Sequence, residues 1–492
     1  MINTLNNSTR LSLDEMNKFL FEGKKVTITE EQKDRVQKAF DFLSNFSKDK
    51  VIYGINTGFG PMAQYKISDE NLSQLQYNLI RSHSNGTGDS LSELQIRALM
   101  ISRLNTLCLG NSGVSPMVVE TIQTYLNNNI YPEVFQHGGV GASGDLVQLA
   151  HLGLGLIGEG YSYHNGKRYK TADIIEEKNI TPLQLSLRDG LALINGTSCM
   201  SGIGIVNLLD SKKLLSWAVA ASSMLNELIA SYDDSFSVQL NGAKQHSGQR
   251  LIAEMMRKHL SDSQLIKKRE DHLFNDGEEK KQTVFKEKVQ EYYSLRCVPQ
   301  IAGPVLDTLY QTAQVLEDEI NSTNDNPVVD VESQNVYHGG NFHGDYVAFE
   351  MDKLKIAVCK LTMLMERQLN YLFNAKLNEK YPPFLNKGVL GLNFGLQGMQ
   401  FTATSTTAES QTLSNPMYVH SISCNNDNQD IVSMGTNAAL IAEKVIDNGF
   451  QVMGIHMIAL CQAMDIMENA DKLSSKTKSV YDKIRAIIPT TL

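Results

Sequence analysis

Four long proline-free stretches with helical periodicity limit the folds that are open to this chain. They cover residues 205–231, 305–321, 345–377 and 434–469. Within the third stretch, apolar residues recur mostly at steps of three and four: Val347, Met351, Leu354, Leu361 and Met365. The sequence of 492 residues contains only 11 prolines, which disfavours a loop-rich all-β fold. Helices of this length usually lie side by side in a bundle or in the core of an oligomer.

The first part of the chain predicts shorter elements. Three segments have helical periodicity: residues 30–46, 69–83 and 91–108. Ser90 with Glu93 fits a capping box at the start of the third segment, and residues 160–171 resemble a β-hairpin with an Asn-Gly turn. We therefore expect a mainly α protein, with a mixed or helical N-terminal domain over residues 1–200 and a central bundle of long helices over residues 201–492.

The composition excludes several classes of protein. A formal net charge of −9 gives no general attraction to nucleic acids or anionic lipids, so neither is an expected partner. Six cysteines occur without any CxxC pair, which favours reduced thiols over a disulfide framework or a zinc site, and we expect no metal. The N-terminal residues lack the apolar run of a signal peptide, and the apolar stretch Leu146–Ile157 is too short and too polar to span a bilayer. These features predict a soluble cytoplasmic protein.

The glycines gather in segments that need an explanation. Two stretches fit the G-x-G-x-x-G pattern of dinucleotide-binding loops, Gly139–Gly144 and Gly153–Gly158. Neither has the sequence of a strand before it, as nucleotide binding would require, and the chain has no G-x-x-x-x-G-K-[ST] loop. Close helix packing explains the glycines of the second stretch better, so we expect no nucleotide.

The first glycine stretch encloses Ala142, Ser143 and Gly144, and it allows two interpretations. It can be the start of a helix, with Ser143 as N-cap and Asp145 complementing the helix dipole. Alternatively, the Gly144 amide nitrogen attacks the Ala142 carbonyl carbon, and loss of water closes a five-membered imidazolone ring. Dehydration of Ser143 then gives the ring an exocyclic methylidene. Small neighbours favour such a ring closure, and the serine hydroxyl is the leaving group.

Seven motifs occur in order along nearly the whole chain. They are YGINTGFG (53–60), GGVGASGDL (138–146), LINGTS (193–198), YSLRCVPQ (293–300), NDNP (324–327), GNFHGD (340–345) and NQDIVSMG (428–435). With these motifs the chain resembles the family of aromatic amino-acid ammonia-lyases and aminomutases, above all its bacterial histidine and tyrosine ammonia-lyase branch.

The resemblance implies a cofactor, an architecture and an assembly. Members of the family carry a 4-methylidene-imidazol-5-one group (MIO), which forms autocatalytically from Ala-Ser-Gly and here would come from Ala142, Ser143 and Gly144. No external cofactor is implied. The implied architecture is helical, as in fumarase and aspartase, and the implied assembly is a homotetramer whose active sites are each built from several subunits.

The resemblance also assigns catalytic roles in an elimination of ammonia from an aromatic amino acid. Tyr53 matches the base that removes the β-proton of the substrate. Because a free phenol has a pKa of about 10, a base of this kind needs hydrogen-bond donors or positive potential near its oxygen. Gly60 matches a backbone group near the amine, and Tyr293 matches a second essential tyrosine. Asn195 matches a donor to the carbonyl of the MIO group.

Further matched positions surround the substrate carboxylate and the ring. Arg296 corresponds to the arginine that binds the carboxylate, which suits the planar donor pair of a guanidinium. Gln290 and Asn326 match polar positions near the carboxylate and the MIO group, and Phe342 matches an aromatic wall. We expect Asp145 to hold the loop in place before it cyclises.

Two residues address the identity of the aryl group. His83 can hydrogen-bond an imidazole or a phenol but gains nothing from a bare phenyl ring, which argues against phenylalanine. Gln429 is neutral where histidine ammonia-lyases carry a glutamate, which argues against histidine. Together they favour L-tyrosine, with trans-4-coumarate as the product. Histidine (giving urocanate), phenylalanine and an aminomutase reaction are the alternatives.

Two other classes of protein predict different features. Helical lyases of the fumarase and argininosuccinate-lyase type carry a G-S-S-x-M-P-x-K-x-N loop, which this sequence lacks. A non-catalytic helical assembly protein would need neither the Ala-Ser-Gly triad nor Tyr53 and Arg296.

Overall fold

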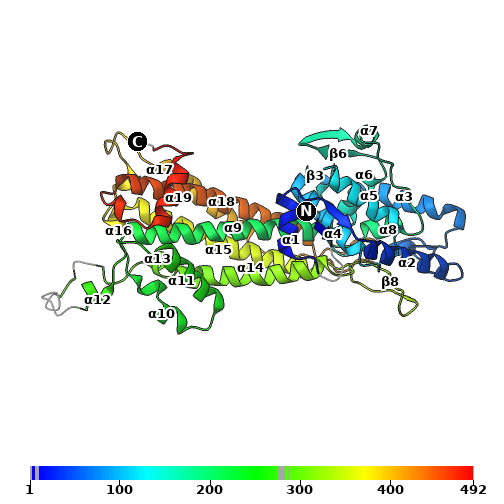
Figure 1. Cartoon of the computed structure of the whole chain (residues 1–492), viewed down its shortest axis with the longest axis horizontal. Coiled ribbons are helices and arrows are strands. Elements are labelled where there is room, and N and C mark those ends of the chain that lie inside the picture. The colour runs from blue at the N-terminus through cyan, green and yellow to red at the C-terminus, as the bar shows by residue number, and fades with distance from the viewer. Residues whose placement is uncertain (1–2, 6–9, 275–282, 286–287, 491–492) are drawn as a thin grey trace. The chain divides into compact units, whose positions relative to one another are not determined.

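The protein is mainly helical, with a few short strands, which confirms the predicted fold class (Figure 1). The computed structural model describes residues 3–5, 10–274, 283–285 and 288–490. The chain forms two compact units. Unit 1 comprises Met1–Leu209, Thr312–Asp352 and Pro416–Ala442, and unit 2 comprises Asp210–Gln311, Lys353–Asn415 and Glu443–Leu492. Two later segments therefore join the N-terminal one in unit 1, whereas the expected division places every residue after 200 in the second domain.

The three helices predicted for the first part of the chain appear in unit 1 as α2, α3 and α4; α2 and α3 bury one face, whereas α4 is buried on nearly all sides. The helices are α1 (Leu13–Phe21), α2 (Glu30–Phe46), α3 (Leu72–His83), α4 (Glu93–Leu107), α5 (Pro116–Asn127), α6 (Leu146–Leu156), α7 (Thr171–Glu177) and α8 (Asp189–Ile194). A short 3-10 turn, Asp69–Asn71, precedes α3 and accounts for the beginning of the predicted segment 69–83.

The start of α4 differs from the prediction. Its N-cap is Ser92, whose side chain accepts a hydrogen bond from the backbone N–H of Gln95. The Gln95 side chain in turn accepts from the backbone N–H of Ser92, which completes a capping box. Ser90 ends strand β3 (Thr87–Ser90), and its hydroxyl donates to the Glu133 carboxylate at 3.3 Å. The capping box predicted at Ser90 and Glu93 is therefore wrong by two residues.

The strands are short and lie in small separate sheets. β1 (Asn3–Leu5) pairs in parallel with β2 (Val26–Ile28), and β3 pairs antiparallel with β5 (Phe135–His137). β6 (Tyr161–His164) pairs antiparallel with both β4 (Tyr131–Pro132) and β7 (Lys167–Lys170), and β8 (Val328–Asp330) pairs antiparallel with β9 (Asn335–Tyr337). The predicted hairpin is confirmed as β6–β7, because Asn165 and Gly166 at its turn have φ values of 52° and 75°.

Helices α3, α6 and α8 pack on one another inside unit 1. A Cβ atom at Gly153 of α6 would lie 3.0 Å from Ile80 Cδ1, and one at Gly155 would lie 2.6 Å from Pro132 Cβ. Close packing is therefore confirmed as the role of these two glycines. Because α6 begins just after the Ala-Ser-Gly triad and α8 ends just before Asn195, this packing brings the two segments together.

The long stretches predicted to be helical form helices that contribute residues to both units: α9 (Ser198–Leu228), α14 (Val298–Ile320), α15 (Asp345–Phe373) and α18 (Gly435–Ile466). Unit 2 also contains α10 (Val238–Gly242), α11 (Ser247–His259), α12 (Arg269–His272), α13 (Tyr293–Arg296), α16 (Ala375–Asn378), α17 (Gln397–Leu413) and α19 (Ser475–Arg485). Within unit 2, a Cβ atom at Gly449 of α18 would lie 2.6 Å from Leu214 Cδ2 of α9 and 3.1 Å from Thr362 Oγ1 of α15. These helices therefore pack side by side, as predicted.

Helix α18 is the one helix among the described residues that has the length and apolar composition to cross a membrane. It is a longer candidate than the stretch Leu146–Ile157 considered above. Its most apolar window of 18 residues has a mean hydropathy of 1.2, and 61 % of that window is buried within the protein. The core helices of globular proteins have the same properties, and we interpret α18 as a core helix.

Candidate active site

A cavity of about 530 Å³ in unit 1 gathers most of the predicted site residues. Its floor and walls come from the loop after α2, from α3, from the loops before α6 and after α8, and from two later loops of the chain. The predicted residues that line it are Tyr53, Gly60, His83, Ser143, Asn195, Asn326, Phe342 and Gln429. Residues far apart in the sequence therefore converge on one space, with Ser143 of the triad at its wall.

The backbone of the triad is folded tightly against the segment that follows α8. Gly144 has a φ of +74°, and a Cβ atom there would lie 2.1 Å from the carbonyl oxygen of Gly196. The Asp145 N–H donates to that same oxygen at 2.8 Å. Only glycine fits at position 144, both in conformation and in space. The small residue that the predicted ring closure asks for at position 144 is therefore also the one that the fold requires there.

Two side-chain amides hold Ser143 from opposite ends of the residue. Asn195 Nδ2 donates to the Ser143 carbonyl oxygen at 2.9 Å, and Gln429 Nε2 donates to Ser143 Oγ at 3.0 Å. The orientation of the Asn195 amide is fixed in turn, because its Oδ1 accepts from the Asn326 N–H at 2.9 Å. These contacts match the donor role implied for Asn195. They also give Gln429 a contact with the triad, in addition to the expected role beside the aryl ring.

Asp145 is completely buried directly after the triad. Its carboxylate accepts from Thr436 Oγ1 at 2.5 Å and from the Met200 N–H at 2.9 Å. Burial raises the pKa of Asp145 to about 6, against the lowering effect of these hydrogen bonds. Asp145, not Ser143, occupies the N-cap position of α6, and no side-chain hydrogen bond caps that helix. The N-cap interpretation of Ser143 is therefore wrong, and Asp145 ties the loop to two distant segments.

Tyr53 lies half-buried at the cavity, on the loop after α2. Its phenol oxygen accepts a hydrogen bond from the Gly60 N–H at 3.0 Å. Its ring meets Phe59 edge to face, with the ring centroids 6.3 Å apart. The phenol oxygen of Tyr53 therefore has a backbone hydrogen-bond donor beside it, as expected for the position that matches the family's base.

His83, the last residue of α3, is held through its Nδ1 atom. This nitrogen lies 2.9 Å from the Leu79 carbonyl oxygen and 3.0 Å from Ser82 Oγ, while the Ser82 hydroxyl also donates to that carbonyl. A carbonyl oxygen can only accept, so Nδ1 carries the proton in this arrangement and Nε2 of the neutral ring is an acceptor. His83 lines the cavity, and in the neutral form of its ring the Nε2 lone pair suits an O–H or N–H donor on a ligand.

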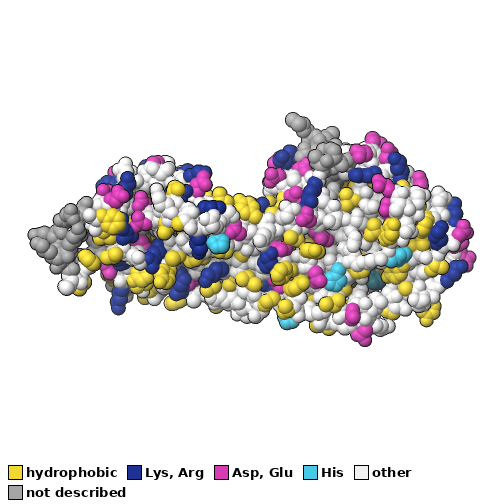
Figure 2. All heavy atoms as spheres, turned by 90° about the horizontal axis from the view of Figure 1, so that it is seen from below, with side chains coloured by type: hydrophobic (Ala, Val, Ile, Leu, Met, Phe, Trp, Pro, Cys, Tyr) yellow, Lys and Arg dark blue, Asp and Glu magenta, His cyan; other side chains and the backbone are white. Residues whose placement is uncertain are grey.

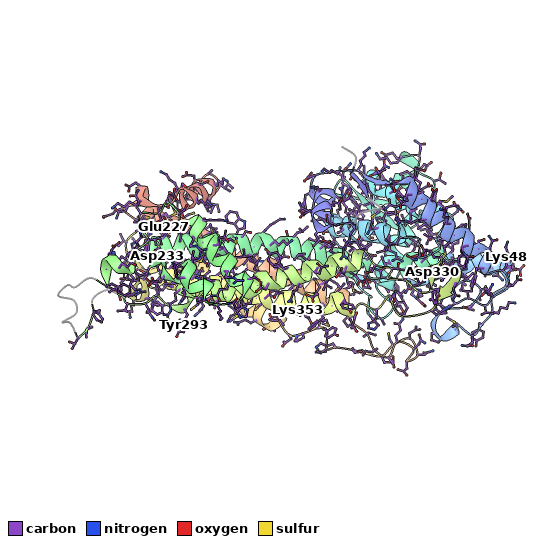
Figure 3. The ribbon with its side chains drawn as sticks, turned by 60° about the horizontal axis from the view of Figure 1, so that its bottom comes forward. Lys48, Glu227, Asp233, Tyr293, Asp330 and Lys353 are labelled. Carbon is purple, nitrogen blue, oxygen red and sulfur yellow. The ribbon has the colours of Figure 1, made fainter. Side chains whose placement is uncertain are left out.

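Three predicted site residues, Gln290, Tyr293 and Arg296, belong to unit 2 and are not among the described residues that line this cavity. Arg296 donates to Gln290 Oε1, and its guanidinium carbon lies 4.9 Å from the Tyr293 ring centroid. Tyr293 is 71 % exposed and lies at the margin of unit 2 (Figure 3). Tyr293 is therefore exposed, whereas Gln290 and Arg296 line a second cavity of about 500 Å³ within unit 2.

The cavity also contains polar residues that the sequence analysis missed. Asn425 and Asn428 line it, and Asn425 belongs to a run of three left-handed residues with φ values of 54°, 52° and 59°, which continues through Asn426 and Asp427. Backbone hydrogen bonds between Cys424 and Gln429 close this turn. Asn and Asp tolerate the left-handed conformation better than other non-glycine residues, so the run Asn-Asn-Asp-Asn was the available signal.

No group of three or more His, Cys, Asp or Glu side chains that could hold a metal ion occurs among the residues that the structure describes.

This arrangement can be compared with known proteins. A family model described as aromatic amino acid lyase matches residues 11–486. The chain belongs to the aromatic amino acid lyase family, which confirms the resemblance found in its motifs.

Similar proteins with different reactions match most of the chain. An MIO-dependent tyrosine 2,3-aminomutase of Streptomyces globisporus is 37 % identical, over 98 % of this chain and 90 % of that protein. A tyrosine ammonia-lyase of Cupriavidus metallidurans is 40 % identical, over 89 % and 83 %. A histidine ammonia-lyase of Geobacillus thermodenitrificans is 36 % identical, over 98 % and 92 %. The identities are too similar to separate the three activities.

The fold is shared with solved structures. The crystal structure of the tyrosine aminomutase from Streptomyces globisporus aligns with a TM-score of 0.95 and 35 % identity, over 100 % of this chain and 93 % of that chain. The helical architecture expected from the resemblance is thereby confirmed.

Proposed function

We propose that this protein is a tyrosine ammonia-lyase, which converts L-tyrosine to trans-4-coumarate and ammonia with an MIO group formed from Ala142, Ser143 and Gly144. One observation carries the proposal: the triad, with Asn195 bound to its central carbonyl, shares a single cavity with Tyr53 and with the acceptor nitrogen of His83.

The residues present fit the formation of this group. The Gly144 nitrogen bonds to the Ala142 carbonyl carbon, and the Ala142 oxygen leaves as water with the protons of the Gly144 and Ser143 nitrogens. Ser143 loses Oγ and its α-proton as a second water. The tight turn at Gly144 favours the attack, and the Gln429 donor at Ser143 Oγ assists departure of the hydroxyl. The product is lighter than the encoded chain by two water molecules.

Once formed, the group supplies an electrophilic methylidene carbon that accepts the substrate amine and makes it a better leaving group. Asn195 stabilises negative charge on the Ser143 carbonyl oxygen through its hydrogen bond of 2.9 Å. Tyr53, as a phenolate, removes the β-proton of the substrate, and the Gly60 N–H stabilises the phenolate oxygen. The elimination then gives the aryl-acrylate and ammonia.

His83 supports a phenol as the aryl group. Its Nε2 is an acceptor, and the tyrosine hydroxyl is a donor that satisfies it, whereas a phenyl ring leaves it unpaired. An imidazole N–H could also donate to it. Gln429, which is neutral and already bound to Ser143, provides no carboxylate for a basic imidazole ring. The two residues together favour tyrosine over histidine.

A second candidate function is a tyrosine 2,3-aminomutase reaction, the activity of the Streptomyces globisporus protein that is 37 % identical to this chain. Such an enzyme returns the ammonia to the aryl-acrylate and releases a β-amino acid. The same residues would serve both reactions, so the products distinguish them.

The carboxylate-binding residues would come from other subunits of a homotetramer. Gln290, Tyr293 and Arg296 belong to unit 2 and do not line the cavity of unit 1 in the same chain, and Tyr293 is exposed, so these residues would complete the cavity of a neighbouring subunit. Hydrophobic side chains form part of the exposed surface (Figure 2). Large ones on the long helices of unit 2 are exposed: Trp217, Tyr310, Ile356 and Phe401. A surface of this kind is typical of helices that are buried in an oligomer.

The function is tested by incubating the purified protein separately with L-tyrosine, L-phenylalanine and L-histidine. We expect stoichiometric ammonia and 4-coumarate from tyrosine, slower release from the other two, and an intact mass that is two waters below the encoded mass. Urocanate as the main product would overturn the tyrosine assignment, β-tyrosine would favour the aminomutase, and an unmodified mass would contradict the whole proposal.

Replacing His83 with phenylalanine should change the substrate preference. We expect His83→Phe to lower kcat/KM for tyrosine by about tenfold to a hundredfold, the range for loss of one buried hydrogen bond, and to raise it for phenylalanine. Rates of aryl-acrylate formation from both substrates measure the effect. His164→Phe, on the exposed hairpin β6–β7, is the matched control and should leave the ratio unchanged. Equal losses for both substrates would show that His83 does not contact the aryl group.

A further inference from the structure

Arg103 lies in the second half of the buried helix α4 and is itself wholly buried. Burial lowers its pKa to about 10, while the nearby charges of Asp325 and Asp145 oppose that shift, so the guanidinium stays charged at neutral pH. A buried charge is costly unless it is hydrogen-bonded, so its partners indicate what it does. None of the seven motifs includes this residue.

The guanidinium of Arg103 binds the end of α8 and the segment that leads into the cavity. Its Nη2 atom donates to the carbonyl oxygens of Ala192 and Asn195, the latter at 2.7 Å. Its Nη1 atom donates to Asn324 Oδ1 at 3.1 Å. A cation at the carboxyl end of a helix satisfies carbonyl groups that have no partner within the helix. Arg103 therefore fixes the backbone from which the Asn195 side chain extends.

A second buried arginine holds the opposite side of the same amide. Arg188 pairs with Asp325 at 2.9 Å and donates to the Asn326 carbonyl oxygen at 2.9 Å. The Asn326 N–H then donates to Asn195 Oδ1, which leaves Asn195 Nδ2 directed at the Ser143 carbonyl oxygen. The amide of Asn195 is thus held between two arginine-bound segments.

Arg103 also supports the surface against which the triad is folded. A Cβ atom at Gly196 would lie only 2.4 Å from Arg103 Nη1, so the guanidinium packs directly against the Gly196 backbone. The Gly196 carbonyl oxygen is the atom that crowds Gly144 and accepts from the Asp145 N–H. Arg103 therefore contacts both Asn195, which bonds to Ser143, and Gly196, which lies against Gly144.

We infer that Arg103 is a positioning residue for the cyclisation of Ala142, Ser143 and Gly144. By fixing residues 192–196, its guanidinium keeps the Asn195 amide on the Ser143 carbonyl oxygen and the Gly196 carbonyl against Gly144. The guanidinium presents its donors on two nitrogens held in one rigid plane, whereas the three donors of a lysine ammonium all lie on a single nitrogen. The inference rests on the proposed function, because it concerns formation of the MIO group.

The test follows loss of water during synthesis of the full chain. Wild type, Arg103→Met, Arg103→Lys and the control Arg97→Met are produced in a cell-free system and sampled over time. Intact mass gives the fraction of chains that are lighter by two waters, near-UV absorbance reports the group independently, and circular dichroism confirms the fold. Arg97 lies on the same helix but donates to Tyr131 and to the Lys24 carbonyl, away from the triad.

We expect folded Arg103→Met to lose water at least about tenfold more slowly than wild type, Arg103→Lys to be intermediate, and Arg97→Met to match wild type. A folded Arg103→Met protein that loses water at the wild-type rate would overturn the inference. If Arg103→Met does not fold, a wild-type rate in folded Arg103→Lys would overturn it instead. Failure of the proposed function is distinguishable, because wild type itself would then keep its full mass.

Discussion

Ser143→Ala is expected to abolish turnover of every aromatic amino acid while leaving the protein folded. Alanine has no β-hydroxyl to lose, so the exocyclic methylidene that the proposed elimination requires cannot form. Relative to the chain before loss of water, the structural cost is small, because the side chain loses only its contact with Gln429 Nε2, worth about 0.5–1.5 kcal/mol for a typical hydrogen bond. Ammonia release, intact mass and the thermal midpoint measure the three consequences.

A matched substitution separates the chemical effect from a general one. Ser333→Ala removes a serine hydroxyl of unit 1 that donates to Asp330 Oδ2 and accepts from the Tyr337 hydroxyl at the β8–β9 turn, so activity and mass deficit should persist. Ser143→Ala protein that still releases ammonia from tyrosine would contradict the proposed mechanism. An inactive and unfolded variant would instead show that Ser143 supports the fold more strongly than its contacts indicate.

Local sequence patterns predicted most of the helices, because the residues that bury one face of a helix recur at helical spacing, as in α2 and α15. They failed where two patterns overlap. Ser90 with Glu93 and Ser92 with Gln95 both fit a capping box, and only the pairing of β3 with β5 removes Ser90 from the helix. Hydrogen bonding to a distant strand has no local signature, so the sequence could not choose between the two pairs.

The site was predicted through motifs, and its supporting residues were missed for a related reason. Tyr53, Ser143 and Asn195 lie in motifs, whereas Arg103 has only the signal of a charge among apolar neighbours. That signal says that a partner exists but not which one. The partners at residues 192, 195 and 324 become visible only when α4, α8 and the loop after α14 pack together.

Long-range packing also places the later segments Thr312–Asp352 and Pro416–Ala442 in unit 1, which the expected division at residue 200 did not include.

Tyr53→Phe should separate formation of the electrophile from its use. The substitution removes one oxygen and keeps the ring that packs edge to face on Phe59. This oxygen accepts a hydrogen bond from the Gly60 N–H, which lies outside the triad. The triad loop should therefore still cyclise, and the mass deficit should persist. Turnover of tyrosine should fall by about 10²–10⁴-fold, the usual contribution of a general base. Ammonia release and intact mass, measured on the same preparation, give both results.

The control for Tyr53→Phe lies on the same loop. Tyr65 is 69 % exposed, and Tyr65→Phe makes the same chemical change without altering the cavity wall. It should retain wild-type turnover, which would assign the loss in Tyr53→Phe to the position of the oxygen and not to the loop. Undiminished turnover in Tyr53→Phe would remove Tyr53 as the base. A Tyr53→Phe protein of full, unmodified mass would instead place Tyr53 in formation of the electrophile, because a base for the substrate has no part in the loss of water from Ser143.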